Sequence, residues 1–250
     1  MALSKKPDWV SSPEVSDVRI DLAAVHRIAV MEGWHEGTWN HFSAKVPGHD
    51  DHILLTPGRT HFSRVTASNL LLAAPDGTIL DGDGLPNESA WAIHFPVHKA
   101  RPEVGCALHA HTPYATALAS IADWQLNERG GQHAAKFYKR LAYYEYQGTV
   151  TATKEGKQIA EALEEKRALI MANHGVLVVG ETVEEAALYL LVLERACRTE
   201  LLAMSTGLAL QKIPKLVAKG ISNHVPGFGE LGYLDAMKAV LDQRGDDYTT

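Results

Sequence analysis

The chain has 250 residues, of which 46% are hydrophobic and 22% charged, a balance that is typical of globular proteins and excludes disordered and fibrous classes. A net charge of −6 argues against a nucleic-acid partner, and no stretch approaches the ~20 apolar residues of a membrane span, so we expect no membrane partner. With only two cysteines and no apolar stretch behind the first lysines to form a secretory signal, we expect a cytoplasmic protein.

The first half of the chain begins with a helix and continues as short strands. Apolar residues at helical spacing predict a helix over 17–32, and Gly33 is a plausible stop. Short segments around Pro and Gly turns predict strands over 42–46, 52–55, 69–74 and 78–80. A helix over 88–100 follows, and we expect Pro96 to kink it.

The second half mixes strands and helices. An apolar strand over 104–111 runs into a helix over 114–120, for which Thr112 and Pro113 supply the N-cap and first residue. Two further strands and three further helices are predicted over 153–166, 168–172, 176–179, 182–204 and 233–241. Strands and helices do not alternate as in parallel βαβ units. We therefore predict a single α/β domain with a central, mainly antiparallel or mixed sheet flanked by helices.

Three histidines stand at the ends of predicted strands. His109 and His111 are two residues apart, so on a strand both side chains point to the same face. His174 lies in a tight Asn-His-Gly turn between two apolar strands. The alternatives are a solvent-facing pair on a strand edge and a histidine that caps its own turn. Because three imidazoles with an open position form a catalytic metal site, we predict a divalent ion here, with Zn²⁺ preferred and Fe²⁺ or Mn²⁺ as alternatives.

These motifs, in this order, resemble the class II aldolase/adducin head-domain family. The segment from Gly37 to Ser43 resembles that family's Gly/Asn/Ser substrate loop, and Arg101-Pro102-Glu103 resembles its Arg-Pro-Asp/Glu lead-in to the histidine pair. The resemblance implies a class II aldolase/adducin-like domain over 17–207. An N-terminal arm, 1–16, precedes this domain, and a C-terminal extension, 208–250, follows it.

The resemblance also implies an activity. In the sugar-phosphate aldolases of the family, three histidines hold a Zn²⁺ that polarises the substrate carbonyl and stabilises an enediolate. A metal-dependent lyase that makes or breaks a C–C bond through a metal-stabilised enolate is therefore expected. Asn40 and Ser43 would orient the small-molecule substrate, and the protein would be a homotetramer. Family aldolases use a Tyr as proton donor, for which the sequence offers Tyr138, Tyr143, Tyr144 and Tyr146.

The chain departs from the aldolase pattern at the acid–base residue and at both phosphate loops. Family aldolases carry a catalytic Glu at the position that Ala90 occupies here, so Glu88, two residues earlier, is the candidate acid–base group; the alternative is a first-turn Glu favoured by the helix dipole. Negative charge on Glu88 would repel phosphate, whereas Arg59 could bind a carboxylate bidentately unless it is an ordinary surface arginine. We expect a non-phosphorylated hydroxy or keto acid as substrate.

Three alternatives remain open. Some members of the family resemble decarboxylases of hydroxylated aromatic acids, and a few resemble non-haem iron oxygenases. An adducin-like interaction domain without enzymatic activity is disfavoured because all three histidine positions are filled. His94 and His98 are i, i+4 on the predicted helix, and we interpret them as residues that pack beside the site.

Overall fold

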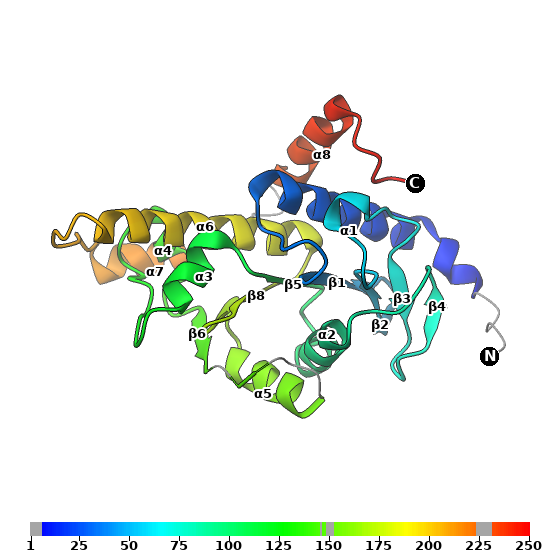
Figure 1. The fold of residues 1–250 in the computed structure, drawn as a ribbon, viewed down its shortest axis with the longest axis horizontal. Coiled ribbons are helices and arrows are strands. Elements are labelled where there is room, and N and C mark those ends of the chain that lie inside the picture. Colours follow the sequence, from blue (N-terminus) through cyan, green and yellow to red (C-terminus); the bar gives the residue numbers. More distant parts are fainter. Residues whose placement is uncertain (1–6, 146, 149–152, 224–231) are drawn as a thin grey trace.

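The computed structural model describes residues 7–145, 147–148, 153–223 and 232–250. Across these residues, eight strands form one sheet in the order β4-β3-β2-β1-β5-β8-β7-β6 (Figure 1). Neighbouring strands run antiparallel except β6 and β7, which are parallel. The prediction of a single α/β domain with a mainly antiparallel, mixed sheet is thus confirmed. The strands are β1 His41–Val46, β2 His49–Leu55, β3 Leu71–Ala73, β4 Ile79–Asp81, β5 Cys106–Ala110, β6 Leu141–Tyr144, β7 Ala168–Met171 and β8 Gly175–Gly180.

Helices cover both faces of the sheet (Figure 1). One face packs against α1 and α6, and the other packs against α2 and α5. Two short 3₁₀ helices, η1 and η2, flank these layers. The helices are η1 Asp8–Ser11, α1 Pro13–Glu32, η2 Phe62–Arg64, α2 Glu88–Ala100, α3 Pro113–Ala119, α4 Gln132–Ala135, α5 Thr153–Leu163, α6 Val183–Met204, α7 Lys215–Asn223 and α8 Tyr233–Arg244.

The alternation of side chains along β5 decides which face carries the chemistry. Cys106 and Leu108 belong to the core shared with α1 and α6, whereas Ala107 belongs to the core shared with α2 and α5. Because strand residues alternate between faces, His109 lies on the same side as Ala107, toward α2. The helix α2 itself continues through Pro96 to Ala100.

The ends of the two long helices follow their sequence signals. Ser12 accepts a hydrogen bond from the Val15 amide at the start of α1, and Gly33 ends the helix with a φ of 70°. At the start of α6, the Thr182 hydroxyl accepts from the Glu185 amide at 3.1 Å. The Glu185 carboxylate reaches the amide of Glu181, one residue before the N-cap. These two hydrogen bonds form a capping box that is shifted by one residue.

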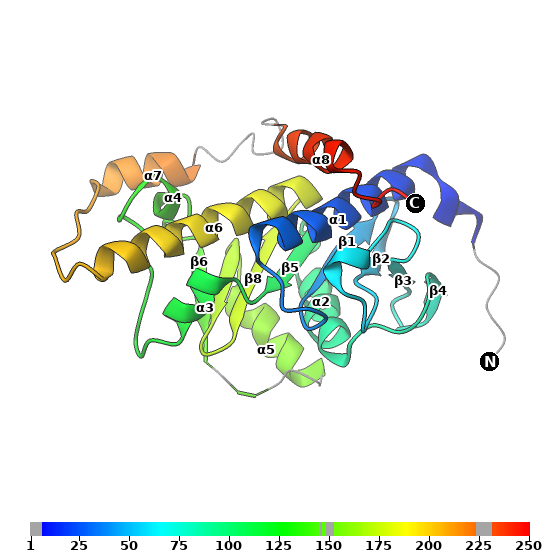
Figure 2. The same cartoon turned by 45° about the horizontal axis from the view of Figure 1, so that its top comes forward.

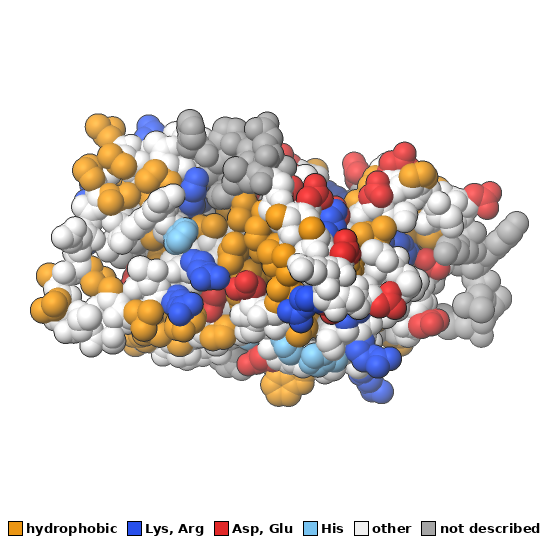
Figure 3. Space-filling model, turned by 90° about the horizontal axis from the view of Figure 1, so that it is seen from above, with side chains coloured by type: hydrophobic (Ala, Val, Ile, Leu, Met, Phe, Trp, Pro, Cys, Tyr) orange, Lys and Arg blue, Asp and Glu red, His pale blue; other side chains and the backbone are white. Residues whose placement is uncertain are grey.

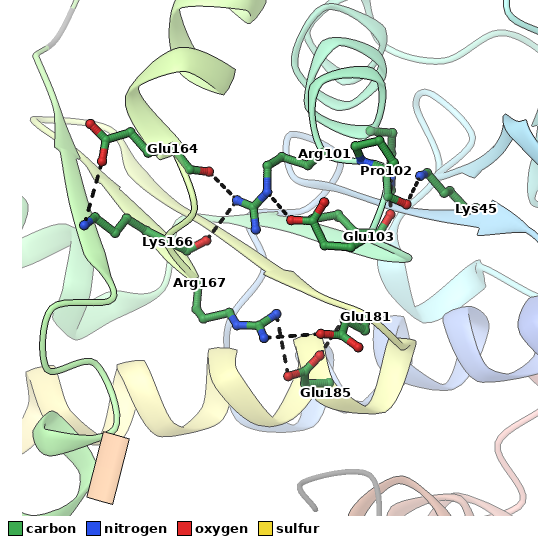
Figure 4. Close-up of polar contacts among 11 residues, drawn as sticks. Lys45, Arg101, Pro102, Glu103, Glu164, Lys166, Arg167, Glu181 and Glu185 are labelled. Carbon is green, nitrogen blue, oxygen red and sulfur yellow. Dashed lines mark hydrogen bonds and ion pairs between the residues drawn. The ribbon is translucent and has the colours of Figure 1, made fainter. Parts of the chain in front are cut away.

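The Arg-Pro-Glu segment before β5 ties two helices together (Figure 4). Arg101 is 9% exposed, and its Nε donates to Glu103 while its Nη1 donates to the carbonyl oxygens of Glu164 and Lys166. The end of α2 is thereby fixed to the turn that follows α5. This turn leads directly into β7, the strand that precedes the turn with His174.

The residues after α6 pack back onto the domain. The helix α7 lies beside α4, and α8 lies along α1 (Figure 2), where Lys238 Nζ is 2.8 Å from a carboxylate oxygen of Asp21. Tyr248 is 2% exposed, and its carbonyl oxygen accepts from the Ala67 amide. Among the described residues, no helix is both long enough and apolar enough to cross a membrane.

Candidate functional site

The end of β5 and the turn between β7 and β8 place three histidines side by side. His109 lies near the end of β5, opposite Leu177 of β8, and His111 follows two residues later. His174 lies in the turn between β7 and β8, where Asn173 has a φ of 52°, a conformation that asparagine tolerates well. Gly175 is required next, because a Cβ there would come within 2.6 Å of the Ala110 carbonyl oxygen.

The three imidazole rings converge on one point. Their centroids are 5.0 Å apart for His109 and His111, 4.9 Å for His109 and His174, and 4.8 Å for His111 and His174. One ring nitrogen of each residue lies within 4.8 Å of those of the other two. This spacing could hold a metal ion, as the sequence predicts.

Hydrogen bonds fix which nitrogen of two rings faces the centre. His109 Nδ1 donates to the Val176 carbonyl oxygen at 3.0 Å, and His111 Nδ1 donates to a carboxylate oxygen of Glu36 at 2.7 Å. Both Nε2 atoms therefore present lone pairs, and they lie only 3.2 Å apart. Two facing lone pairs repel unless a cation or proton lies between them, so the donor set fits a divalent metal.

Burial keeps His109 and His174 in the neutral form that binds metals. Loss of solvent, followed by the neighbouring imidazoles, holds the pKa of His109 well below its usual value. Burial, followed by the charge of His111, lowers the pKa of His174 to about 4, and the Glu36 carboxylate partly offsets this shift. Neutral imidazole is the ligand form, so no protons need to be displaced from His109 and His174 at neutral pH.

A cavity of about 680 Å³ opens over the triad. Its walls include Glu36, Trp39, Ser89 and Ile93 in addition to the histidines. Trp39 is 71% exposed and stands at the rim, and Ser89 lies in the first turn of α2. The volume is sufficient for a small organic substrate.

Comparison with known proteins identifies the fold. Residues 20–201 match the family described as Class II Aldolase and Adducin N-terminal domain. The chain belongs to this family. It is 33% identical over 190 residues to an aldolase class 2 protein of Caulobacter vibrioides, a match that covers 76% of this chain and 73% of that protein.

Two solved structures of the class II aldolase family resemble this one closely. A crystal structure of an aldolase II superfamily protein from Pseudomonas syringae has a TM-score of 0.87 and 35% identity, covering 96% of this chain and 97% of its own. An L-fuculose 1-phosphate aldolase from Glaciozyma antarctica has a TM-score of 0.83 and 26% identity, covering 97% of both chains. The predicted membership of the class II aldolase/adducin family is confirmed.

Two of the predicted site residues of this class II aldolase-family chain lie outside the cavity wall. Glu88 is exposed as the first residue of α2, while Ala90, at the family's acid–base position, is fully buried. Arg59 is also exposed, in a turn where its φ is 61°. Neither Glu88 nor Arg59 is among the described residues that line the cavity over the triad.

The other two predicted substrate residues are buried behind the cavity. Asn40 is 1% exposed, and its side-chain oxygen accepts from the Glu36 amide at 2.6 Å, so it holds the loop that carries Glu36. Ser43 is fully buried, and its hydroxyl contacts His94 and His98 rather than the cavity. Both residues therefore belong to the support of the site.

The tyrosine candidates occupy other surroundings. The Tyr143 hydroxyl accepts from the Leu126 amide at 2.9 Å, and the Tyr144 hydroxyl donates to Gln158. Tyr138 is half-buried, and Tyr146 lies outside the described residues. None of the first three is among the described residues of the cavity wall.

Sequence reasoning missed Glu36, and it did not single out Trp39 within the Gly37–Ser43 segment. Both lie in the loop between α1 and β1, which crosses the sheet end next to β5. Glu36 directly precedes the Gly37–Ser43 segment, so its closeness to the predicted substrate loop was the sequence signal that could have identified it. Its pairing with His111 depends on the β1–β5 contact, which the sequence did not reveal.

Proposed function

We propose that this protein is a metal-dependent lyase that makes or breaks a C–C bond in a non-phosphorylated hydroxy or keto acid. The convergence of His109, His111 and His174 at the base of a substrate-sized cavity carries this proposal. These residues would hold the ion, with Zn²⁺ preferred and Fe²⁺ or Mn²⁺ as alternatives. Bound there, a divalent ion acts as a Lewis acid on a carbonyl or carboxylate oxygen.

The protein side chains orient the ligands and shape the cavity. Glu36 accepts the Nδ1 proton of His111, which directs the Nε2 lone pair inward and raises the basicity of that ligand. Asn40 holds the Glu36 amide, which keeps this carboxylate in place. Trp39 and Ile93 supply apolar wall, which reduces the water around a bound substrate.

Two carboxylates compete for the acid–base role. We propose Glu88, which the sequence favours and which precedes the cavity residue Ser89 directly. Glu36 is the alternative because it lines the cavity itself, although it is already engaged with His111. Replacing each carboxylate separately by its amide distinguishes the two assignments.

Decarboxylation is the second candidate function, and Ala90 is the observation that favours it. An aldol cleavage needs a base that removes a proton from the substrate, and the family's position for that base carries a buried methyl group here. Loss of CO₂ leaves the bonding electrons on carbon without any such proton removal. Arg59 would anchor the substrate carboxylate in either reaction.

The test is metal analysis followed by an activity screen. The purified protein, reloaded with Zn²⁺, Fe²⁺ or Mn²⁺, is assayed with hydroxy acids, keto acids and aldehydes, and with sugar phosphates for comparison. Turnover of acids supports the proposal, and CO₂ release separates decarboxylation from aldol cleavage. A metal-free protein whose melting temperature does not respond to these ions would favour an adducin-like interaction domain.

A further inference from the structure

The short link between β5 and α3 carries one of the three histidines. The strand β5 ends at Ala110 and the helix α3 begins at Pro113, so His111 and Thr112 belong to neither element. His109, by contrast, lies within β5 and is paired with β8. The position of the His111 ring therefore depends on how firmly the first turn of α3 is held, as well as on the strand before it.

The start of α3 lacks a cap from its own N-cap side chain. Thr112 occupies the N-cap position, but its buried hydroxyl makes no hydrogen bond to any described residue. Pro113, the first helical residue, has no amide hydrogen. The Thr116 amide donates to the Thr112 carbonyl oxygen at 2.9 Å. The two amides of this turn that need an acceptor from outside the helix are thus those of Tyr114 and Ala115.

A carboxylate of α6 accepts from both amides. The Tyr114 amide donates to Glu194 Oε1 at 2.8 Å, and the Ala115 amide donates to Glu194 Oε2 at 3.0 Å. Glu194 is only 6% exposed, so bulk water does not replace these partners. A buried carboxylate is costly unless hydrogen bonds satisfy it, and unpaired helix amides are costly as well. Each side of this contact therefore stabilises the other, and α6 caps α3 in place of the N-cap side chain.

A second contact from α6 reaches the same turn. The Arg198 guanidinium carbon lies 5.5 Å from the centroid of the Tyr114 ring, at the distance of a cation–π contact. Arg198 is four residues after Glu194, so both side chains lie on the same side of α6. Ala115 and Leu118 of α3 belong to the core that α6 shares. The first turn of α3 is thus fixed to α6 by polar contacts as well as by apolar packing.

We propose that Glu194 is a positioning residue for His111. By holding the first turn of α3, Glu194 keeps the link before it at the place where the His111 ring meets the other two histidines and the Glu36 carboxylate. Without this carboxylate the turn would open part of the time, and only the closed fraction would present all three imidazoles to an ion. The apparent metal affinity would fall in proportion to that fraction. The inference rests on the proposed function for the role of the ion.

Glu200 offers a matched control on the same helix. It is 8% exposed, and its carboxylate also accepts from two N–H groups, Trp124 Nε1 at 2.9 Å and the Asn127 amide at 2.8 Å. These partners lie beyond the end of α3, in the segment before α4. Glu194→Gln and Glu200→Gln therefore disturb the same kind of buried contact, and both should lower the melting temperature. Only the first change affects the turn that follows the histidine link.

The first experiment uses the metal-free protein at pH 8. Long-range ¹H–¹⁵N spectra of the ¹⁵N-histidine-labelled protein measure the fraction of His111 that carries its proton on Nδ1, as the contact with Glu36 requires. This fraction should be lower in Glu194→Gln than in the wild type, and amide exchange in the first turn of α3 should be faster. Glu200→Gln should match the wild type in both respects. An equal fraction in all three proteins would overturn the inference.

The second experiment uses the metal ion alone. In competition with a chelator, Glu194→Gln should bind Zn²⁺ about 3- to 10-fold more weakly than the wild type, the size of one lost helix cap, whereas Glu200→Gln should bind as the wild type does. Bound Co²⁺, whose visible absorption depends on the geometry of its ligands, should show a shifted spectrum in Glu194→Gln only. Equal affinities and spectra in the two variants contradict the inference, even when both variants melt at a lower temperature.

Failure of this inference differs from failure of the proposed function. A wild type that binds no metal, together with the expected change in the His111 proton, contradicts the proposed function and supports the positioning role of Glu194. A wild type that binds Zn²⁺ no more tightly than Glu194→Gln does contradicts the positioning role alone. If Glu194→Gln does not fold, Glu194→Asp, which keeps the charge on a side chain one methylene shorter, takes its place, with Glu200→Asp as the control.

Discussion

His111 Nδ1 lies 2.7 Å from a carboxylate oxygen of Glu36, which joins the end of β5 to the loop that follows α1. Through this pair, a carboxylate from the loop after α1 lies behind one histidine of the candidate metal centre. Carboxylates that hold a ligand histidine fix its ring orientation and raise its basicity. The affinity of the site for metal therefore depends on a loop as well as on the sheet.

Replacing one ligand should remove the metal while preserving the fold. His111 follows the end of β5 and is half-buried, so His111→Ala creates no core cavity. We expect elemental analysis to show loss of stoichiometric metal, with an unchanged circular dichroism spectrum. Full metal occupancy in this variant would rule out the three-histidine centre.

Glu36→Gln and Glu88→Gln form a pair with opposite expected outcomes. Glu36→Gln should weaken metal binding by about 10- to 100-fold, the usual effect of losing a carboxylate behind a ligand histidine. Glu88→Gln should leave metal affinity unchanged and lower kcat. Competition with a chelator measures the first quantity, and steady-state kinetics at saturating metal measures the second. Full activity in Glu88→Gln would leave Glu36 as the acid–base candidate.

Arg59→Ala tests the proposed carboxylate anchor. Loss of an interaction made equally in the ground and transition states should raise KM for a hydroxy or keto acid more than it lowers kcat. The matched control is Arg64→Ala, because Arg64 is likewise exposed and is absent from the described cavity wall. Robust turnover of a sugar phosphate, insensitive to Arg59→Ala, would restore the ordinary sugar-phosphate aldolase.

Acid should destabilise the fold through its buried histidines, and His26 is the one to test because it lies away from the triad cavity. Burial, partly offset by the Leu22 carbonyl, lowers its pKa from 6.5 to about 3, so between these values the unfolded chain binds a proton that the native protein does not. The free energy of unfolding should therefore fall below pH 6.5, by up to about 1.4 kcal/mol per pH unit for this residue. Urea titrations from pH 4.5 to 7.5 should show a shallower decline in His26→Gln; equal slopes would contradict this.

We propose that the chain assembles as a homotetramer. Leu208, beyond the end of α6, and Leu216, on α7, are 75% and 84% exposed. Hydrophobic side chains are visible on the surface at this end of the molecule (Figure 3). Burying them between subunits would remove apolar surface from water. Light scattering at micromolar concentration should give four times the chain mass, and a monomer would contradict the prediction. Leu216→Glu should shift the mass downward without unfolding the chain.

The sequence predicted most elements and the histidine triad because both depend on local patterns. Strand alternation sets the common face of His109 and His111, and the Asn-His-Gly turn marks His174. The strand β6 was missed, since its four residues pair in parallel with β7 and offer too short a pattern. A C-terminal helix, α7, which begins directly after Pro214, was missed as well.

The remaining features of the site depend on contacts between distant segments. Ser43 belongs to a motif that resembles a substrate loop, yet β1 places its hydroxyl between two histidines of α2. His94 and His98, interpreted from the sequence as neighbours of the site, both lie within hydrogen-bond distance of this hydroxyl, and His94 also lies 2.8 Å from His41 Nδ1. Such relationships arise from the packing of α2 on β1 and have no signature in either segment alone.

The antiparallel pairing of β5 with β8 also has a kinetic consequence. His109 lies on β5, His111 follows the end of this strand, and His174 lies in the turn before β8, so the three rings meet only after this long-range pair has formed. Contacts between distant segments form slowly because loop-closure entropy must first be overcome. In refolding experiments, the return of tight metal binding should therefore mark the completion of the central sheet, later than the helices regain their circular dichroism.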